Sequence, residues 1–233
     1  RSTLSRSSAA PDVYKRQNLR SYILLDISRS MEYKSDKISK LDYGNYLSAA
    51  LAYLMINQQD GVGLTLFDNK IKTFIPPRSK PSHVNTILSH LDNIGSGKDT
   101  DVGLVLHEMA ERIKKRGLVI IISDLFDEVE NIMRGLKHFR HNKQEIIVFH
   151  VMDRKELEFD FTNRTKFKDM ETNEQITTEP WKIRKVYQKS IQSYQNELRL
   201  KCREQKIDYV PLFTYQRLDL ALNEYLKKRQ RLG

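Results

Sequence analysis

Two short apolar runs, each followed closely by an aspartate, constrain the fold more than any other feature of the sequence. Residues 21–25 lead directly into Asp26, and the aliphatic residues 118–122 lead into Ser123 and Asp124. Apolar runs of this length are typical of parallel strands that are covered on both faces. Parallel strands of an α/β sheet end at a common edge, where such proteins bind their ligands. We therefore expect both aspartates at one edge of a sheet.

Segments with helical periodicity alternate with the predicted strands. The expected helices cover residues 39–57, 81–92, 100–115, 128–141, 180–205 and 218–229. The expected additional strands cover residues 62–67, 71–75, 145–151 and 208–213. This order predicts an α/β fold, in which a doubly wound, mostly parallel sheet carries helices on both faces.

Prolines and one segment of changed pattern refine this prediction. Pro76 and Pro77 are expected to end the strand that begins at Ile71. Pro211 places the last strand at an edge of the sheet, because proline cannot donate a hydrogen bond to a neighbouring strand. Residues 153–178 replace the strand–helix alternation with short alternating stretches, at 157–161 and 165–167. We expect a small β excursion there, inserted into a domain that spans residues 18–233.

The single cysteine, Cys202, excludes an intrachain disulfide. A chain without disulfides fits a reducing compartment, so we predict a cytoplasmic location. Cys202 lies in a helical pattern without a basic partner, and we expect an inert thiol. No apolar run approaches the roughly 20 residues that a membrane helix needs, and we recognise no secretory signal pattern.

The first 17 residues differ from the rest of the chain. They are rich in Ser and Arg and lack periodicity, and residues 12–17 resemble a translated sequencing-adapter sequence. We expect residues 1–17 to be a non-native or disordered leader, and we exclude them from the fold prediction. They carry a net charge of +3, so +7 of the chain's +10 remains, spread over the predicted helices.

Polar side chains cluster where the predicted strands end. Asp26, Ser28 and Ser30 follow the first strand, Thr100 precedes a helix, and Asp124 follows the central strand. Carboxylate and hydroxyl oxygens suit a hard divalent cation, and Mg²⁺ is the expected ion, with Mn²⁺ and Ca²⁺ as alternatives. With only two carboxylates, the cation would remain electrophilic and could accept an Asp or Glu from a protein partner.

These five residues match a known pattern. Asp26-x-Ser28-x-Ser30, Thr100 and Asp124 resemble the metal-ion-dependent adhesion site of von Willebrand factor A-type domains. The resemblance implies that both serines and the threonine can bind the metal directly, and that the aspartates act through water. It also implies a protein-binding function. The rim of the site, with Arg29 and Asp127 as candidates, would then contact the partner.

A closer resemblance covers nearly all of residues 19–230. The chain is similar to the bacterial family named "domain of unknown function 58". The matching stretches are residues 25–31, 40–43, 61–68, 76–78, 100–101 and 122–125, and residues 167–172 resemble the family's β excursion. Members of that family are often encoded beside MoxR-type AAA+ ATPases. The resemblance therefore implies an adaptor or cofactor protein that works with such an ATPase. Full-length members carry an upstream segment, and we expect that residues 1–17 stand in its place here.

Other polar residues near these elements have simpler explanations. Asp101 is expected to cap the helix that follows it rather than bind metal. Asp42 is expected to be a solvated acid at a helix start. His138 and His141 stand three residues apart on a predicted helix, and without a third ligand we expect both at the surface.

Two other functions remain open from the sequence. An aspartate after the first strand is similar to that of haloacid-dehalogenase phosphatases, but Ser28 occupies the place of their general acid. A metal-dependent phosphohydrolase-like enzyme is therefore an alternative, while our prediction is a protein that is not an enzyme. The second alternative is nucleic-acid binding through the basic residues of the predicted helix 180–205. Glu197 and Glu204 interrupt that helix, and it has no evident aromatic platform.

Overall fold

The computed structural model describes residues 19–95, 97, 101–161, 165–168, 175–178 and 180–232. Six strands form the main sheet: β1 (Arg20–Asp26), β2 (Gly61–Phe67), β3 (Ile71–Arg78), β4 (Leu118–Ser123), β5 (Glu145–Met152) and β8 (Asp208–Phe213). Their order is β3-β2-β1-β4-β5-β8. Only β3 runs antiparallel to its neighbour, and the other pairs are parallel. The predicted α/β class is confirmed.

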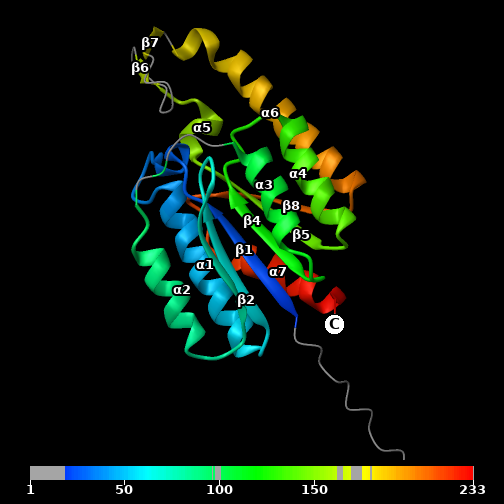
Figure 1. Ribbon diagram of the computed structural model, residues 1–233. Coiled ribbons are helices and arrows are strands. Elements are labelled where there is room, and N and C mark those ends of the chain that lie inside the picture. Colours follow the sequence, from blue (N-terminus) through cyan, green and yellow to red (C-terminus); the bar gives the residue numbers. More distant parts are fainter. Residues whose placement is uncertain are drawn as a thin grey trace, which may run out of the picture.

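Helices cover both faces of this sheet (Figure 1). One face carries α1 (Lys40–Asn57), α2 (His83–Asp92) and α7 (Asp219–Leu232). The other face carries α3 (Val102–Arg112), α4 (Val129–His141) and the long α6 (Pro180–Glu204). None of the helices in the described residues has the length and apolar character needed to cross a membrane.

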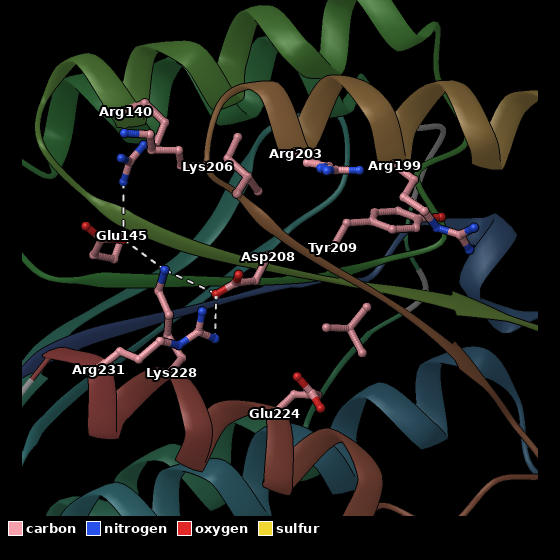
Figure 2. A pocket seen from close by; sticks show the side chains of 12 residues that line it. Arg140, Glu145, Arg199, Arg203, Lys206, Asp208, Tyr209, Glu224, Lys228 and Arg231 are labelled. Carbon is pink, nitrogen blue, oxygen red and sulfur yellow. Dashed lines mark hydrogen bonds and ion pairs between the residues drawn. The ribbon is translucent and has the colours of Figure 1, made fainter.

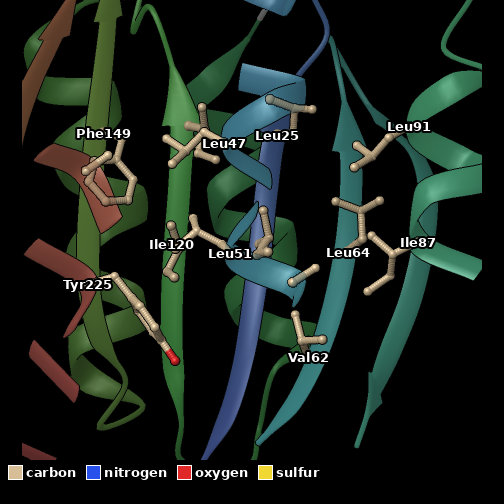
Figure 3. Close-up of a cluster of buried hydrophobic side chains, with 14 of the residues drawn as sticks. Leu25, Leu47, Leu51, Val62, Leu64, Ile87, Leu91, Ile120, Phe149 and Tyr225 are labelled. Carbon is tan, nitrogen blue, oxygen red and sulfur yellow. The ribbon is translucent and has the colours of Figure 1, made fainter. Parts of the chain in front are cut away.

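The central strands are apolar throughout because each of their faces lies under a helical layer. Ile23 and Leu25 of β1 pack toward α1, whereas Tyr22 and Leu24 pack toward α3 and α4. Every residue of β4 is buried. Figure 3 shows the first of these two cores, in which side chains from α1, α2 and α7 meet those of the sheet. Burial on both faces explains why neither run alternates with polar residues.

Local sequence signals set the helix starts beside the sheet's carboxyl edge. Ser39 and Asp42 form a capping box at the start of α1, each side chain accepting a hydrogen bond from the other's backbone N–H. Asp101 caps α3 by accepting from the N–H of Leu104 at 2.9 Å, as predicted. Asp42 is thus an acid at a helix start, as predicted, and its partly exposed side chain also caps the helix.

Two expectations about local structure were wrong. The strand that begins at Ile71 does not end at Pro76 but continues through both prolines to Arg78. The prolines are tolerated because β3 is an edge strand with a register shift opposite Gly63. The alternating stretch 157–161 was expected to be extended, yet α5 (Arg154–Glu158) begins within the predicted excursion. Asp153 and Glu156 form a capping box that starts this helix.

The β excursion itself is present. Strands β6 (Thr165–Lys168) and β7 (Gln175–Thr178) pair antiparallel as a second, two-stranded sheet. Pro211 lies on β8 at the opposite edge of the main sheet from β3, as predicted. The N–H of Phe213 on the same strand donates to the side chain of Gln216 at 3.3 Å.

Candidate metal centre

The loop after β1 is held by hydrogen bonds to a buried carboxylate. Asp26 is the last residue of β1 and is fully buried. Its Oδ1 accepts from the N–H of Ser28 at 2.9 Å, and its Oδ2 accepts from the hydroxyl of Ser123 at 2.6 Å. The hydroxyls of Ser28 and Ser30 lie 3.0 Å apart. The structure thus gathers these oxygens at the carboxyl ends of β1 and β4.

Asp124 follows β4 at the same edge and has one oxygen that is not satisfied. Its Oδ2 accepts from the Lys40 ammonium at 2.8 Å. Its Oδ1 is buried and has no hydrogen-bond partner among the residues that the structure describes. A buried polar atom without a partner is costly, and more so when it is charged. Asp124 lies beside the loop of residues 27–30, which we call the serine loop, and its Oδ1 marks the place where a further polar group or cation would be most favourable.

Lys40, the first residue of α1, is the main feature that the sequence did not reveal. Its side chain is almost completely buried, with only 2% of the residue exposed. Its Nζ lies 2.8 Å from Asp124 Oδ2 and 2.7 Å from Oε1 of Glu156 on α5. Lys40 is 84 residues from Asp124 and 116 from Glu156 along the chain. No local pattern indicates contacts between residues so far apart.

The two aspartates titrate differently because only one of them faces a cation. Burial, and next the charge of Asp124, raise the pKa of Asp26 to about 7. Burial alone would also raise the pKa of Asp124, but the charge and hydrogen bond of Lys40 lower it below the usual value. Asp26 is therefore partly protonated at neutral pH unless another positive charge reaches it.

His150 lies close to the carboxylates but remains neutral. Burial lowers its pKa to about 4, and its Nδ1 lies 2.6 Å from the hydroxyl of Tyr209. This histidine on β5 therefore adds no positive charge to the site at neutral pH. Lys40 is the cation that balances the Asp124 carboxylate.

The remaining predicted residues divide into three cases. Thr100 lies outside the described residues. Arg29 lies on the short 3₁₀ helix η1 (Arg29–Glu32) and is partly exposed. Asp127 accepts hydrogen bonds from the N–H groups of Gly103 (3.0 Å) and Glu128 (2.6 Å). Its carboxylate thus ties the starts of α3 and α4 together.

Gly97 brings the segment before α3 against the serine loop. A Cβ added at Gly97 would lie 1.7 Å from the carbonyl oxygen of Ile27 and 2.9 Å from the Cα of Ser28. Only a residue without a side chain allows the two backbones to approach so closely. The close approach requires glycine at this position.

The donor set fits a hard divalent cation. Two aspartates and two serine hydroxyls supply oxygen atoms, which Mg²⁺, Mn²⁺ and Ca²⁺ prefer, and Oδ1 of Asp124 has no hydrogen-bond partner among the described residues. The described residues contain no group of three or more His, Cys, Asp or Glu side chains that could hold a metal. A metal here would therefore depend on the serine hydroxyls. His138, which was predicted to lie at the surface, packs beside His107 there.

An apolar groove opens beside Asp124. Its volume is about 680 Å³, and it lies between the carboxyl ends of β4 and β5 and the helix α6. Leu125, Phe126 and Leu157 line it, together with Tyr187 and Ile191 of α6. Phe126 is 67% exposed. A large exposed ring beside a cavity of this kind is typical of a binding surface.

The strand order and the loop after β1 together define the class of the protein. A sheet ordered β3-β2-β1-β4-β5-β8, with helices on both faces, is that of a von Willebrand factor A-type α/β domain. The chain belongs to the family described as protein of unknown function DUF58, whose sequence model matches residues 11–197. No curated protein matches the chain.

Solved structures share the fold at low sequence identity. An aerotolerance-related membrane protein from Bacteroides fragilis NCTC 9343, with multiple mutations to serines, is 16% identical with a TM-score of 0.63, over 91% of this chain and 99% of that chain. The conserved hypothetical protein BatB from Bacteroides thetaiotaomicron is 17% identical with a TM-score of 0.59, over the same shares. The pilus adhesin SpaC from Lactobacillus rhamnosus GG, in an open conformation, is 12% identical with a TM-score of 0.55, over 92% of this chain and 30% of that chain. These identities establish a common fold alone.

Proposed function

We propose that this protein is a metal-ion-dependent protein-binding module. Domains of the von Willebrand factor A type often mediate metal-dependent protein interactions. The observation that carries the proposal is the buried Oδ1 of Asp124, which has no hydrogen-bond partner among the described residues, at the edge where Asp26 and the paired hydroxyls of Ser28 and Ser30 also lie. An arrangement that leaves a carboxylate oxygen unsatisfied inside the fold is expected where a ligand completes the site.

Each residue of the site has a proposed role. Ser28, Ser30 and Thr100 would bind the cation directly, and Asp26 and Asp124 would act through water. Mg²⁺ is the proposed ion. The cation supplies an electrophilic centre to which a partner's Asp or Glu can bind. Arg29, together with the groove that begins at Asp124 and includes Asp127, would contact the rest of that partner.

We further propose that the partner system includes a MoxR-type AAA+ ATPase, with this protein as its adaptor in the cytoplasm. The family to which the chain belongs supports this proposal. Binding of the purified ATPase would be measured at constant Mg²⁺ with wild-type protein and with Asp26→Ala. Constant Mg²⁺ keeps the ATPase supplied with its own metal ion. If only the variant loses binding to the ATPase, the loss is due to the metal site of this protein.

Titration calorimetry tests the metal site itself. Mg²⁺ and Mn²⁺ are titrated into the full chain and into Asp26→Ala and Ser28→Ala, with far-ultraviolet circular dichroism to confirm folding. We expect one ion per wild-type chain, at least tenfold weaker binding in Ser28→Ala and none in Asp26→Ala. Equal binding by wild type and a folded Asp26→Ala variant would refute the proposed site.

The groove offers a second, separable test. Phe126→Ser removes an exposed aromatic ring that lines the groove and is not one of the proposed metal ligands. We expect this variant to bind Mg²⁺ as wild type does and to bind the protein partner at least tenfold more weakly. A variant that binds partner normally would exclude the groove from the interface while leaving the metal site intact.

We propose no catalytic role. The position two residues after Asp26 is Ser28, which cannot act as a carboxylic general acid. His150, the nearest imidazole, is buried with a pKa of about 4. A phosphatase assay with Mg²⁺ and a generic phosphate ester tests this assignment, and turnover that is lost in Asp26→Ala would overturn it.

A further inference from the structure

A second concave surface lies at the other end of the sheet from the serine loop. We call it the basic furrow, and its volume is about 520 Å³. Figure 2 shows that it crosses the β8 edge, with side chains from α4 and the end of α6 on one side and from α7 on the other. Glu145 and Asp208, the first residues of β5 and β8, lie at its floor. Asp26 instead ends β1 and Asp124 follows β4, so the metal site lies at the opposite, carboxyl ends of the strands.

Each acid of the furrow is already paired with a cation that lies in the furrow or, for Glu224, next to it. Glu145 pairs with Arg140 (3.3 Å) and Lys228 (2.8 Å), and Asp208 pairs with Lys228 (3.1 Å) and Arg231 (3.6 Å). Glu224 pairs with Lys227, 2.7 Å away. These pairs leave little negative charge to oppose an incoming anion.

Three further cations line the furrow and form no ion pair with the described residues. No ion pair in the described part of the chain involves Arg199, Arg203 or Lys206. Arg199 and Arg203 lie one helical turn apart on α6, and Lys206 follows its end. All three are exposed. Like charges placed together without an acid repel one another, so an anionic ligand would relieve that repulsion.

The shape and chemistry of the furrow favour one kind of occupant. Small-molecule sites are enclosed and mostly apolar, whereas charged side chains make up most of this lining. Single-stranded nucleic acid needs aromatic faces for stacking, and the furrow's one aromatic side chain, Tyr209, holds His150 through its hydroxyl. Pro211 removes an N–H from β8, which disfavours an added strand. A flexible, acidic protein segment offers carboxylates to the cations and needs neither an enclosed apolar cavity, nor stacking on aromatic rings, nor strand pairing.

We propose that the basic furrow binds an acidic segment of a protein partner, through Arg199, Arg203 and Lys206, without a metal ion. The proposal is independent of the metal-dependent function. Because the furrow and the serine loop lie at opposite ends of the strands, one partner could occupy the furrow while another occupies the loop.

The test uses a fluorescein-labelled heptaglutamate peptide and fluorescence anisotropy in EDTA at low salt. EDTA removes any contribution of the metal site. The full chain is compared with Arg199→Gln/Arg203→Gln/Lys206→Gln and with a control, Lys80→Gln/Lys185→Gln/Lys189→Gln. The control loses the same charge from exposed positions outside the furrow. We expect at least tenfold weaker binding by the furrow variant, less than twofold by the control, and a wild-type affinity that falls as salt rises.

Four results would overturn the proposal. The first two are that wild type does not bind the peptide, and that both triple variants lose peptide affinity equally. The third is that a folded Asp26→Ala variant loses peptide affinity. The fourth is that a seven-nucleotide single-stranded DNA binds more tightly than the peptide and depends on the same three cations. Equal loss would mean that overall charge alone attracts the peptide. Preference for the DNA would assign the furrow to nucleic acid.

Discussion

At the scale of single residues, Lys40 sets the charge of the candidate metal centre. Its ammonium bonds to Asp124 and to Glu156 while it is nearly excluded from solvent. A divalent cation would draw on the same Asp124 carboxylate that Lys40 already neutralises. The lysine should therefore weaken metal binding and, at the same time, stabilise the metal-free fold.

Replacing this cation tests both effects. We expect Lys40→Met to bind Mg²⁺ at least tenfold more tightly, because a nearby positive charge is removed. In EDTA its free energy of unfolding should fall by about 3–5 kcal/mol, because the buried Asp124 and the partly exposed Glu156 lose their partner. Calorimetry and urea unfolding measure the two quantities. The double variant Lys40→Met/Glu156→Gln, which keeps the net charge of wild type, should recover part of the stability. Unchanged metal affinity in both variants would contradict this role.

The raised pKa of Asp26 makes a prediction about pH. Its value of about 7 in the fold exceeds the ordinary 3.8, so between these values the folded state holds more protons than the unfolded state. The free energy of unfolding contributed by Asp26 therefore falls as pH rises from about 4 to about 7.

Asp26→Asn removes this contribution. In EDTA we expect the variant to gain stability relative to wild type between pH 4.5 and pH 8, by a few kcal/mol at about 1.4 kcal/mol per pKa unit. Urea unfolding at the two pH values measures the gain, and other titrating groups cancel in the difference. With Mg²⁺ at pH 8 we expect wild type to be the more stable of the two, because in the proposed site only wild type would bind the ion. A difference that does not change with pH would show that Asp26 ionises normally.

At the scale of helices and strands, the sequence predicts most of the sheet and its helical layers. Continuous apolar runs identify β1 and β4 because burial on both faces removes polar residues from them. Asp101 is predictable as a cap because that interaction is local. The path of β3 through Pro76 and Pro77 is not predictable from local sequence, because it depends on the position of β3 at the edge of the complete sheet. The same limit applies within the site, where Lys40 meets Asp124 through tertiary packing alone.

The loop between α2 and α3 carries a prediction at this scale. Gly97→Ala would place a Cβ 1.7 Å from the carbonyl oxygen of Ile27, whereas a Cβ at Gly95 meets nothing within 4 Å. We expect Gly97→Ala to lower the free energy of unfolding by about 1–3 kcal/mol, as overpacking does, and to weaken Mg²⁺ binding at least tenfold. Gly95→Ala is the matched control and should change neither quantity appreciably. Similar effects of the two substitutions would mean that the contact with the serine loop does not matter.

At the scale of the whole molecule, the C-terminal helix joins distant parts of the chain. Asp60, in the turn between α1 and β2, is buried and accepts from the N–H of Leu19 at 3.0 Å. Arg229 of α7 donates to both oxygens of the same carboxylate, at 2.6 and 3.3 Å. One carboxylate thus links the start of β1, the end of α1 and the last helix.

Arg229→Met breaks this link and leaves Asp60 buried without its cation. We expect the free energy of unfolding to fall by about 2 kcal/mol, less than for a fully buried pair because Arg229 is itself 25% exposed on its side chain. Arg231→Met is the control, since that residue is largely exposed and its pair with Asp208 is 3.6 Å long. Exposed pairs contribute little, so the control should lose less than about 0.5 kcal/mol. If urea unfolding shows that both variants lose the same free energy of unfolding, the Asp60–Arg229 pair does not stabilise the fold more than an exposed pair does.

Both edge strands of the main sheet carry proline, with Pro76 and Pro77 on β3 and Pro211 on β8. An edge strand is otherwise a template on which a second chain can add its own strand, and repetition of that step leads to fibrils. Each proline on the two outer strands lacks the backbone N–H group that an added strand would need as a hydrogen-bond donor. Backbone pairing between crowded copies of this domain is thereby disfavoured, so contacts between copies would depend on side chains.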